Sequence, residues 1–254
     1  MAETIGSYDL GCLQGRMSLF LALLNISTLL RPVVELIQPL DILEYGTIAA
    51  DNGVQIDFGE YCVVKRYPPS MPSGNIIRNL VELHGLLKTH SVPNVVELKK
   101  TNMKNKHVTL TPIGRASPPE NVHQLLTALR DVLKTLVALH AIAVMHRDLR
   151  WENVLKYQDD DEKWFLVDFD DGAKSPAKKV NHLSPQSHAP EILSSSSHTV
   201  KVAIWSVGYL LMTSPVRDLP PELESMKGQC LQIAPSSRPT AETLLKAVEK
   251  LLYT

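Results

Sequence analysis

The chain has 254 residues, a hydrophobic fraction of 44%, a charged fraction of 21% and a formal net charge of −1. These values are ordinary for a soluble globular protein with one large domain or two lobes, and the near-neutral charge favours neither nucleic acid nor an anionic membrane as a partner. Three widely spaced cysteines provide no metal-binding spacing and no disulfide framework, which indicates an intracellular compartment, the cytoplasm or the nucleus.

The N-terminal part contains an apolar run, Met17–Leu30. A signal peptide would begin with basic residues, whereas Glu3 and Asp9 precede this run. The run is also too short to span a bilayer and soon meets Pro32. We therefore predict no signal peptide and no transmembrane helix, but a tail and a helix that Pro32 ends or restarts, together forming an extension over residues 1–40.

Residues 41–114 have the character of a β-rich lobe. Asp51-Asn52-Gly53 is a strong hairpin signal, and the apolar spacing over 76–89 is helical. A crossing rich in proline and glycine follows and separates this part from the next. Strands are expected over 42–50, 54–58, 61–67, 95–98 and 107–111.

Residues 115–254 are mostly helical and form the predicted second lobe. The stretch 170–188 is polar, with Lys, Ser and Pro, and is expected to be a loop. A short strand is expected over 165–167. Helices are expected over 121–140, 200–212 and 240–252.

Two short segments carry residues suited to chemistry on a phosphate. The stretch 146–155, His-Arg-Asp-Leu-Arg-Trp-Glu-Asn-Val-Leu, places an acid at Asp148 and an amide at Asn153 on one loop. The acid could orient a hydroxyl, and the amide oxygen could hold a metal ion. Asp168 then ends an apolar run. These pieces resemble the catalytic loop and the metal-binding aspartate of the protein kinases.

The resemblance implies an α+β, bilobal protein-kinase-like fold with a small β-rich N-lobe and a larger helical C-lobe, here shortened. It makes Asp148 the acid near the attacking hydroxyl, and it makes Asn153 and Asp168 the ligands of Mg²⁺. Arg150 stands where Ser/Thr kinases carry a phosphate-contacting lysine, so the positive charge is kept with altered geometry. ATP is the expected cofactor.

Six further residues are expected at the nucleotide. Lys65 resembles the family's phosphate-binding lysine, and Glu82 is its expected helix partner. Gly46 is the only match to the family's glycine-rich loop, because Asp41 and Leu43 replace the first two glycines. The segment Leu110-Thr111-Pro112-Ile113-Gly114 looks like that of divergent kinase domains in fungi and related eukaryotes, some attached to Crinkler-type effectors. It provides Leu110, Thr111 and Ile113 as candidate nucleotide contacts.

Several positions depart from the family pattern or extend it. Asp170 replaces a glycine, and with Asp171 it could raise metal affinity or shift preference toward Mn²⁺. Ala203 replaces an acid that supports the catalytic loop in the family. The resemblance also predicts that Ser184 contacts the catalytic acid and that Glu191 forms a buried pair with Arg238.

Three functions are compatible with these residues. The first is an ATP-dependent Ser/Thr protein kinase. The second is a pseudokinase that serves as an interaction module, which the poor glycine loop, Asp170 and Ala203 favour. The third is a small-molecule phosphotransferase of related fold, against which Glu191 and Arg238 argue. The sequence identifies neither a protein substrate nor an oligomeric state.

Overall fold

The computed structural model describes residues 8–36, 46–50, 52–194 and 197–253. The chain divides into two compact units, Met1–Leu43 and Glu44–Thr254. In the first unit, helix α1 (Leu13–Leu36) continues past Pro32, so the prediction that the helix ends or restarts there was wrong. An interior proline costs a helix one N–H bond without always stopping it. In the part of the chain that the structure describes, no helix is long and apolar enough to cross a membrane.

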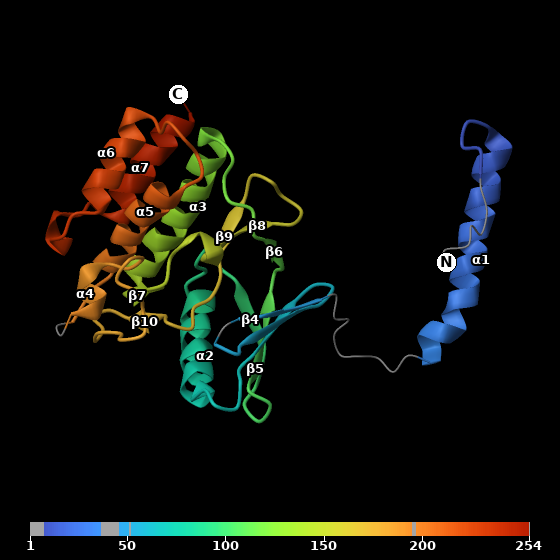
Figure 1. Ribbon diagram of the computed structural model, residues 1–254, viewed down its shortest axis with the longest axis horizontal. Coiled ribbons are helices and arrows are strands. Elements are labelled where there is room, and N and C mark those ends of the chain that lie inside the picture. The colour runs from blue at the N-terminus through green and yellow to red at the C-terminus, as the bar shows by residue number, and fades with distance from the viewer. Residues whose placement is uncertain (1–7, 37–45, 51, 195–196, 254) are drawn as a thin grey trace. The chain divides into compact units, whose positions relative to one another are not determined.

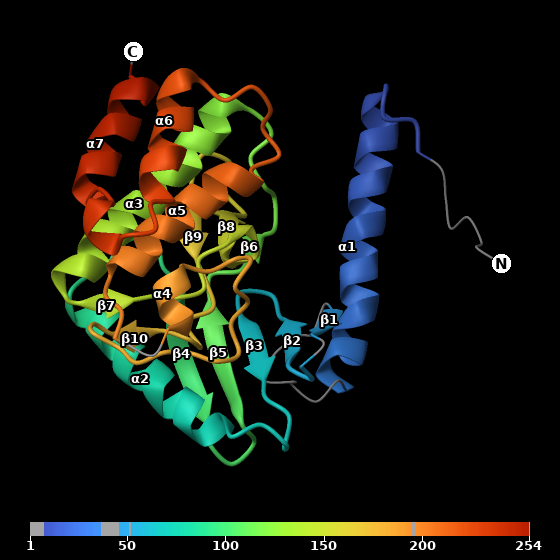
Figure 2. The same cartoon turned by 60° about the vertical axis from the view of Figure 1, so that its left-hand side comes forward.

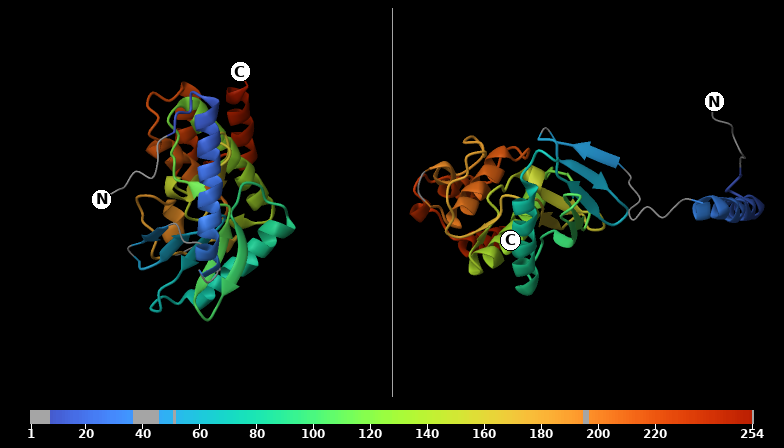
Figure 3. Two further views of the ribbon diagram at one scale, coloured as in Figure 1. Left: turned by 90° about the vertical axis from the view of Figure 1, so that its right-hand side faces the viewer. Right: turned by 90° about the horizontal axis from the view of Figure 1, so that it is seen from below.

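The second unit begins with a five-stranded antiparallel sheet (Figures 1 and 3). Helix α2 (Ser73–Thr89) packs beside β4 and buries an apolar stripe that includes Ile77, Leu83 and Leu87. The order in the sheet is β1 (Gly46–Ala49), β2 (Gln55–Phe58), β3 (Val63–Arg66), β5 (His107–Thr111) and β4 (Glu97–Asn102).

The predicted Asn-Gly hairpin joins β1 to β2. Gly53 has a φ of 82°, a left-handed conformation that glycine adopts without steric cost. Its N–H donates to the Ala50 carbonyl at 2.8 Å, which closes the turn. The first part of the predicted 42–50 strand, with Asp41 and Leu43 before the hairpin, lies outside the described residues.

Helices dominate the rest of the unit (Figure 2). In α3 (Val122–Ala141), the Asn121 side chain accepts a hydrogen bond from the Gln124 N–H and caps the first turn. Helix α3 packs against α7 (Ala241–Leu252) and contributes a fully buried row that includes Leu129, Leu133 and Leu136. The remaining helices are α4 (Pro190–Leu193), α5 (Lys201–Thr213), α6 (Pro221–Cys230) and the 3₁₀ turns η1 (Trp151–Asn153) and η2 (Pro235–Ser237).

Short strands hold the loops that carry the candidate site. One sheet has the order β6, β8, β9, and a second pairs β7 with β10. Residues 146–150 therefore start from β7 and reach β8 through η1. This arrangement of a β-rich and a helical lobe confirms the predicted bilobal α+β fold. The strands are β6 (Gly114–Arg115), β7 (Val144–Met145), β8 (Val154–Tyr157), β9 (Trp164–Leu166) and β10 (Ala173–Lys174).

Candidate functional site

The loop between β7 and β8 binds its two functional side chains to each other. The Asn153 amide nitrogen donates to the Asp148 carbonyl at 2.7 Å and to Asp148 Oδ2 at 3.0 Å. Both residues are buried. The Asn153 amide oxygen accepts no hydrogen bond from the described residues and can serve a cation.

Asp168 is held at the site by its neighbours. It has a φ of 63°, and Arg147 in the loop between β7 and β8 has a φ of 71°. Such left-handed conformations of non-glycine residues cost energy and cluster at functional sites. The buried Phe169 ring packs on His84 and His146, and His146 Nε2 lies 2.7 Å from the Val167 carbonyl. These contacts fix the backbone on both sides of the acid.

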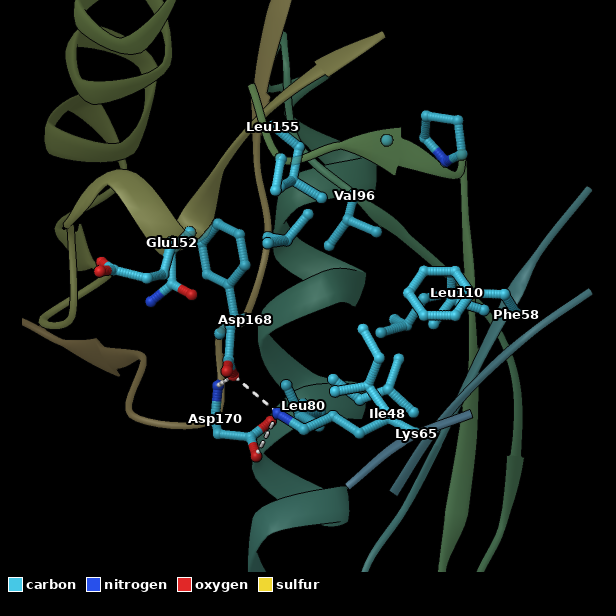
Figure 4. A pocket seen from close by; sticks show the side chains of 18 of the residues that line it. Ile48, Phe58, Lys65, Leu80, Val96, Leu110, Glu152, Leu155, Asp168 and Asp170 are labelled. Atoms are coloured by element: carbon cyan, nitrogen blue, oxygen red, sulfur yellow. Dashed lines mark hydrogen bonds and ion pairs between the residues drawn. The ribbon is translucent and has the colours of Figure 1, made fainter. Parts of the chain in front are cut away.

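One cavity of about 260 Å³ is lined by Lys65, Asn153 and Asp168 (Figure 4). Asn153 is the residue that binds Asp148. Val96 and Leu155 lie in an apolar part of the wall, and Lys65, Asp168 and Asp170 lie together in a charged part (Figure 4). Pockets for small ligands start near 300 Å³ and combine an apolar wall with a few polar groups. The cavity has this composition, and its volume lies just below that size range.

Lys65 pairs with two aspartates rather than with the predicted Glu82. Its Nζ atom lies 2.8 Å from Asp168 Oδ1 and 2.8 Å from Asp170 Oδ2. Glu82 is instead exposed and pairs with Lys174. The prediction was wrong because Glu82 lies on the outer side of α2, which presents Leu80 and His84 to the cavity.

The three charges in this part of the cavity influence one another. Burial alone would lower the pKa of Lys65, but the two carboxylates outweigh it and raise that pKa. Burial would raise the pKa of Asp168, yet Lys65 holds it low. Burial, together with repulsion from Asp168, raises the pKa of Asp170 to about 6. The trio carries one more acid than base, so a cation would be accommodated here.

The two extra acids after Phe169 already have protein partners. The Tyr67 hydroxyl donates to Asp170 Oδ1 at 2.9 Å, in addition to the Lys65 pair. Asp171 Oδ1 lies 2.8 Å from His182 Nε2. In the described ranges, no three His, Cys, Asp or Glu side chains come together as a metal cluster. That Asp170 and Asp171 raise metal affinity or shift preference toward Mn²⁺ stays a prediction.

The nucleotide-loop prediction for Gly46 is corrected by the sheet register. Gly46 pairs with Phe58 at the end of β1 remote from the hairpin turn, and a Cβ there would meet nothing within 4 Å. Ile48 lines the cavity instead. The glycine at the β1–β2 turn is Gly53, which the sequence analysis assigned to a hairpin and not to the nucleotide loop.

In the segment 110–114, predicted to contact the nucleotide, every second residue lines the cavity. Leu110 lines the cavity, and so do Pro112 and Gly114. The side chains of Thr111 and Ile113 are not among the described lining groups, and Thr111 Oγ1 donates to the Tyr61 carbonyl at 3.1 Å. Alternation is expected in extended chain because successive side chains point in opposite directions.

Asp148 is contacted by a residue that the sequence did not indicate. His188 Nε2 lies 3.0 Å from Asp148 Oδ1, and Arg150 Nε lies 3.1 Å from the same oxygen without hydrogen-bond alignment. The predicted contact, Ser184, is exposed and donates to Gln186. Burial would raise the pKa of Asp148, but the hydrogen bond from His188 and the charge of Arg150 hold it below its usual range.

Two supports of this loop lie in the helical lobe. The predicted pair is confirmed, because Arg238 contacts both Glu191 oxygens, at 2.5 and 2.9 Å. Ala203 is buried and offers no polar group, but Trp151 Nε1 donates to the Leu210 carbonyl at 3.0 Å. Trp151 therefore ties the loop between β7 and β8 to α5 by a different route.

Comparison with known proteins agrees with the geometry. The protein kinase domain family matches residues 46–228. The chain is 33% identical over 252 residues to Crinkler effector protein 8 of Phytophthora infestans, covering 97% of this chain and 41% of that protein. It is 26% identical over 256 residues to mitogen-activated protein kinase kinase kinase ANP1 of Arabidopsis thaliana, covering 80% and 37%.

A third relative is serine/threonine-protein kinase dst2 of Dictyostelium discoideum, 32% identical over 164 residues that cover 50% of this chain and 14% of that protein. The chain thus spans less than half the length of these relatives. Their identities of a third or less mark a divergent sequence. On the family match and the geometry together, the chain belongs to the protein kinase domain family.

Proposed function

We propose that this chain is an active protein kinase that transfers the γ-phosphate of ATP to a Ser or Thr hydroxyl with Mg²⁺. One observation carries the proposal: Lys65, Asp168 and Asn153, from three separate segments, line one cavity, and Asn153 binds the Asp148 carboxylate. Phosphoryl transfer needs mainly positioning and charge neutralisation, and this set provides both.

The residues present fit ATP and a divalent metal. The apolar part of the cavity wall suits a planar base, and Lys65 in the charged part suits phosphates. Mg²⁺ prefers oxygen ligands, and the Asn153 amide oxygen and Asp168 Oδ2 both lack hydrogen-bond partners among the described residues. When bound, the metal nucleotide supplies the phosphoryl group and neutralises part of its charge.

The chain's own groups then have separate tasks. Asp148 stays ionised because its pKa is held low, so it can orient the attacking hydroxyl and accept its proton. Arg150 keeps a permanent positive charge next to Asp148, where charge develops during transfer. Lys65 holds the phosphates, with Asp168 and Asp170 as its counterions.

A pseudokinase is the second candidate, favoured by two observations. Lys65 is engaged by two acids, and the β1–β2 turn contains a single glycine, Gly53. Both features weaken phosphate binding, since a carboxylate repels phosphate and side chains limit the approach of backbone amides. In this alternative the fold serves as a binding module.

Thermal shift with ATP, with and without Mg²⁺, followed by autophosphorylation, separates the two. We expect an ATP shift that depends on the metal, and label transfer that Asp148→Ala abolishes. Glu82→Gln is the matched control because it removes an exposed acid on α2. A parent protein with neither shift nor label would support the binding module, and transfer to a sugar but not to protein would indicate a small-molecule phosphotransferase.

A further inference from the structure

His188 lies at the end of the segment that leads away from Asp168, and its ring is held at both nitrogens. Nε2 is 3.0 Å from Asp148 Oδ1. Nδ1 is 2.9 Å from the Ser184 carbonyl and 2.9 Å from Ser187 Oγ. The residue is 4% exposed, so water does not compete for these contacts.

The partners determine where the ring protons are. Nδ1 can donate to the Ser184 carbonyl or accept from the Ser187 hydroxyl, so it has a partner in either tautomer. Nε2 faces a carboxylate oxygen, which only accepts. Nε2 therefore donates to Asp148 Oδ1, and this bond is charge-assisted because its acceptor is a carboxylate.

The backbone after His188 is anchored, which keeps the ring in place. Ala189 and Ile192 are fully buried, and the Val180 N–H donates to the Ile192 carbonyl at 3.0 Å. Glu191 is bound through two oxygens to the buried Arg238. The ring therefore projects from a rigid turn, as a positioning group requires.

We propose that His188, and not Ser184, is the residue between Asp168 and α4 that positions the catalytic acid Asp148. Asp148 Oδ1 is held by His188 and Oδ2 by Asn153 Nδ2 at 3.0 Å, so the carboxylate cannot rotate. The kinetic consequence rests on the proposed kinase function, whereas the bond between His188 and Asp148 does not.

The kinetic test compares His188→Ala, His188→Gln and Ser184→Ala. We expect His188→Ala to lower kcat about tenfold to hundredfold with the KM for ATP unchanged, because one charge-assisted bond orients the acid. His188→Gln should recover part of the loss, since its amide can still donate. Ser184→Ala should behave like the parent. A higher kcat in His188→Ala, meaning that the ring blocks the acid, would overturn the inference, and so would equal losses in Ser184→Ala.

An independent readout uses the ¹⁵N resonances of the histidine rings and needs no activity. His188→Gln removes the His188 ring, so the ¹⁵N resonances that disappear in this variant are those of His188. In the parent we expect Nε2 to carry a proton toward Asp148 Oδ1, and Asp148→Asn should shift the Nε2 resonance. Asp171→Asn, which removes the partner of His182 instead, is the matched control and should leave it in place. An inactive parent with this Asp148-dependent shift would refute the kinase function alone, and an unchanged spectrum in Asp148→Asn would refute the His188 inference.

Discussion

Lys65 Nζ lies 2.8 Å from Asp170 Oδ2, an acid in the loop where the family has a glycine. Asp170 is thus a second counterion for Lys65, alongside Asp168. From α2, the cavity receives Leu80 and His84, and neither is an acid. In this chain, both acids beside Lys65 come from the loop after β9 and neither comes from α2.

Replacing Asp170 should therefore impair the site more than replacing Glu82. We expect Asp170→Asn to lower kcat/KM for ATP about tenfold to hundredfold, because a hydrogen bond to a charged group contributes about 1.5–3 kcal/mol. Glu82→Gln should change it less than about twofold, since an exposed pair contributes little. Steady-state kinetics on both variants provides the measurement.

A relocated acid should restore part of that loss. Leu80 lines the same cavity as Lys65, so Leu80→Glu on the Asp170→Asn background supplies a carboxylate from the helix (Figure 4). Tighter ATP binding in Asp170→Asn would show that the acid mainly repels phosphate. A changed preference between Mg²⁺ and Mn²⁺ would assign the acid to the metal instead.

The pair between Glu191 and Arg238 should stabilise the helical lobe. The Arg238 side chain is fully buried and also donates to the carbonyls of Gln232 and Lys201. Arg238→Met leaves a largely buried carboxylate without its partner, which typically costs about 3–5 kcal/mol. Urea unfolding measures the loss. Glu224→Gln breaks the exposed pair with Lys227 and should cost less than about 1 kcal/mol, and equal losses would contradict the prediction.

Trp151 should support the catalytic loop without contacting ATP. Trp151→Phe removes the hydrogen bond to the Leu210 carbonyl and keeps an aromatic ring on Trp164. We expect a loss of about 1 kcal/mol in unfolding free energy and a lower kcat with an unchanged KM for ATP. Chemical denaturation and kinetics on one preparation test both parts. A raised KM with normal kcat would place the role of Trp151 at the nucleotide instead.

His84 should make the protein less stable in acid. Burial lowers its pKa to about 4, from an ordinary value near 6.5. The unfolded chain therefore binds a proton first as the pH falls, so stability is complete above pH ~6.5 and declines toward pH ~4. At pH ~5 the loss is about 2 kcal/mol.

His84→Leu should remove that part of the acid sensitivity. Urea unfolding at pH ~7 and pH ~5 gives the free energy of unfolding at each pH. The difference between the two free energies should be smaller in His84→Leu than in the parent. His90→Gln, at an exposed position after the same helix, should leave the difference as in the parent. If His84→Leu keeps the full difference, another group is responsible.

Local patterns were sufficient for much of the fold. Apolar spacing predicted α2, α3, α5 and α7 to within a few residues, and Asn-Gly predicted the β1–β2 hairpin. Asp148 and Asn153 are five residues apart, so the sequence already placed them on one loop, although it did not predict the hydrogen bonds between them. Helix periodicity and turn chemistry are short-range effects, and a single sequence records them.

Partner choice at the site was decided by the tertiary structure. Lys65 and Asp168 are 103 positions apart, and Asp148 and His188 are 40 apart. The orientation of α2 about its axis places Glu82 on its outer side. The conformation of the segment before α4 places His188, and not Ser184, next to Asp148. The sequence alone determined which chemical groups this protein has and in what order. Only the packing of helices and loops decided which of them meet, because side-chain direction depends on contacts between distant parts of the chain.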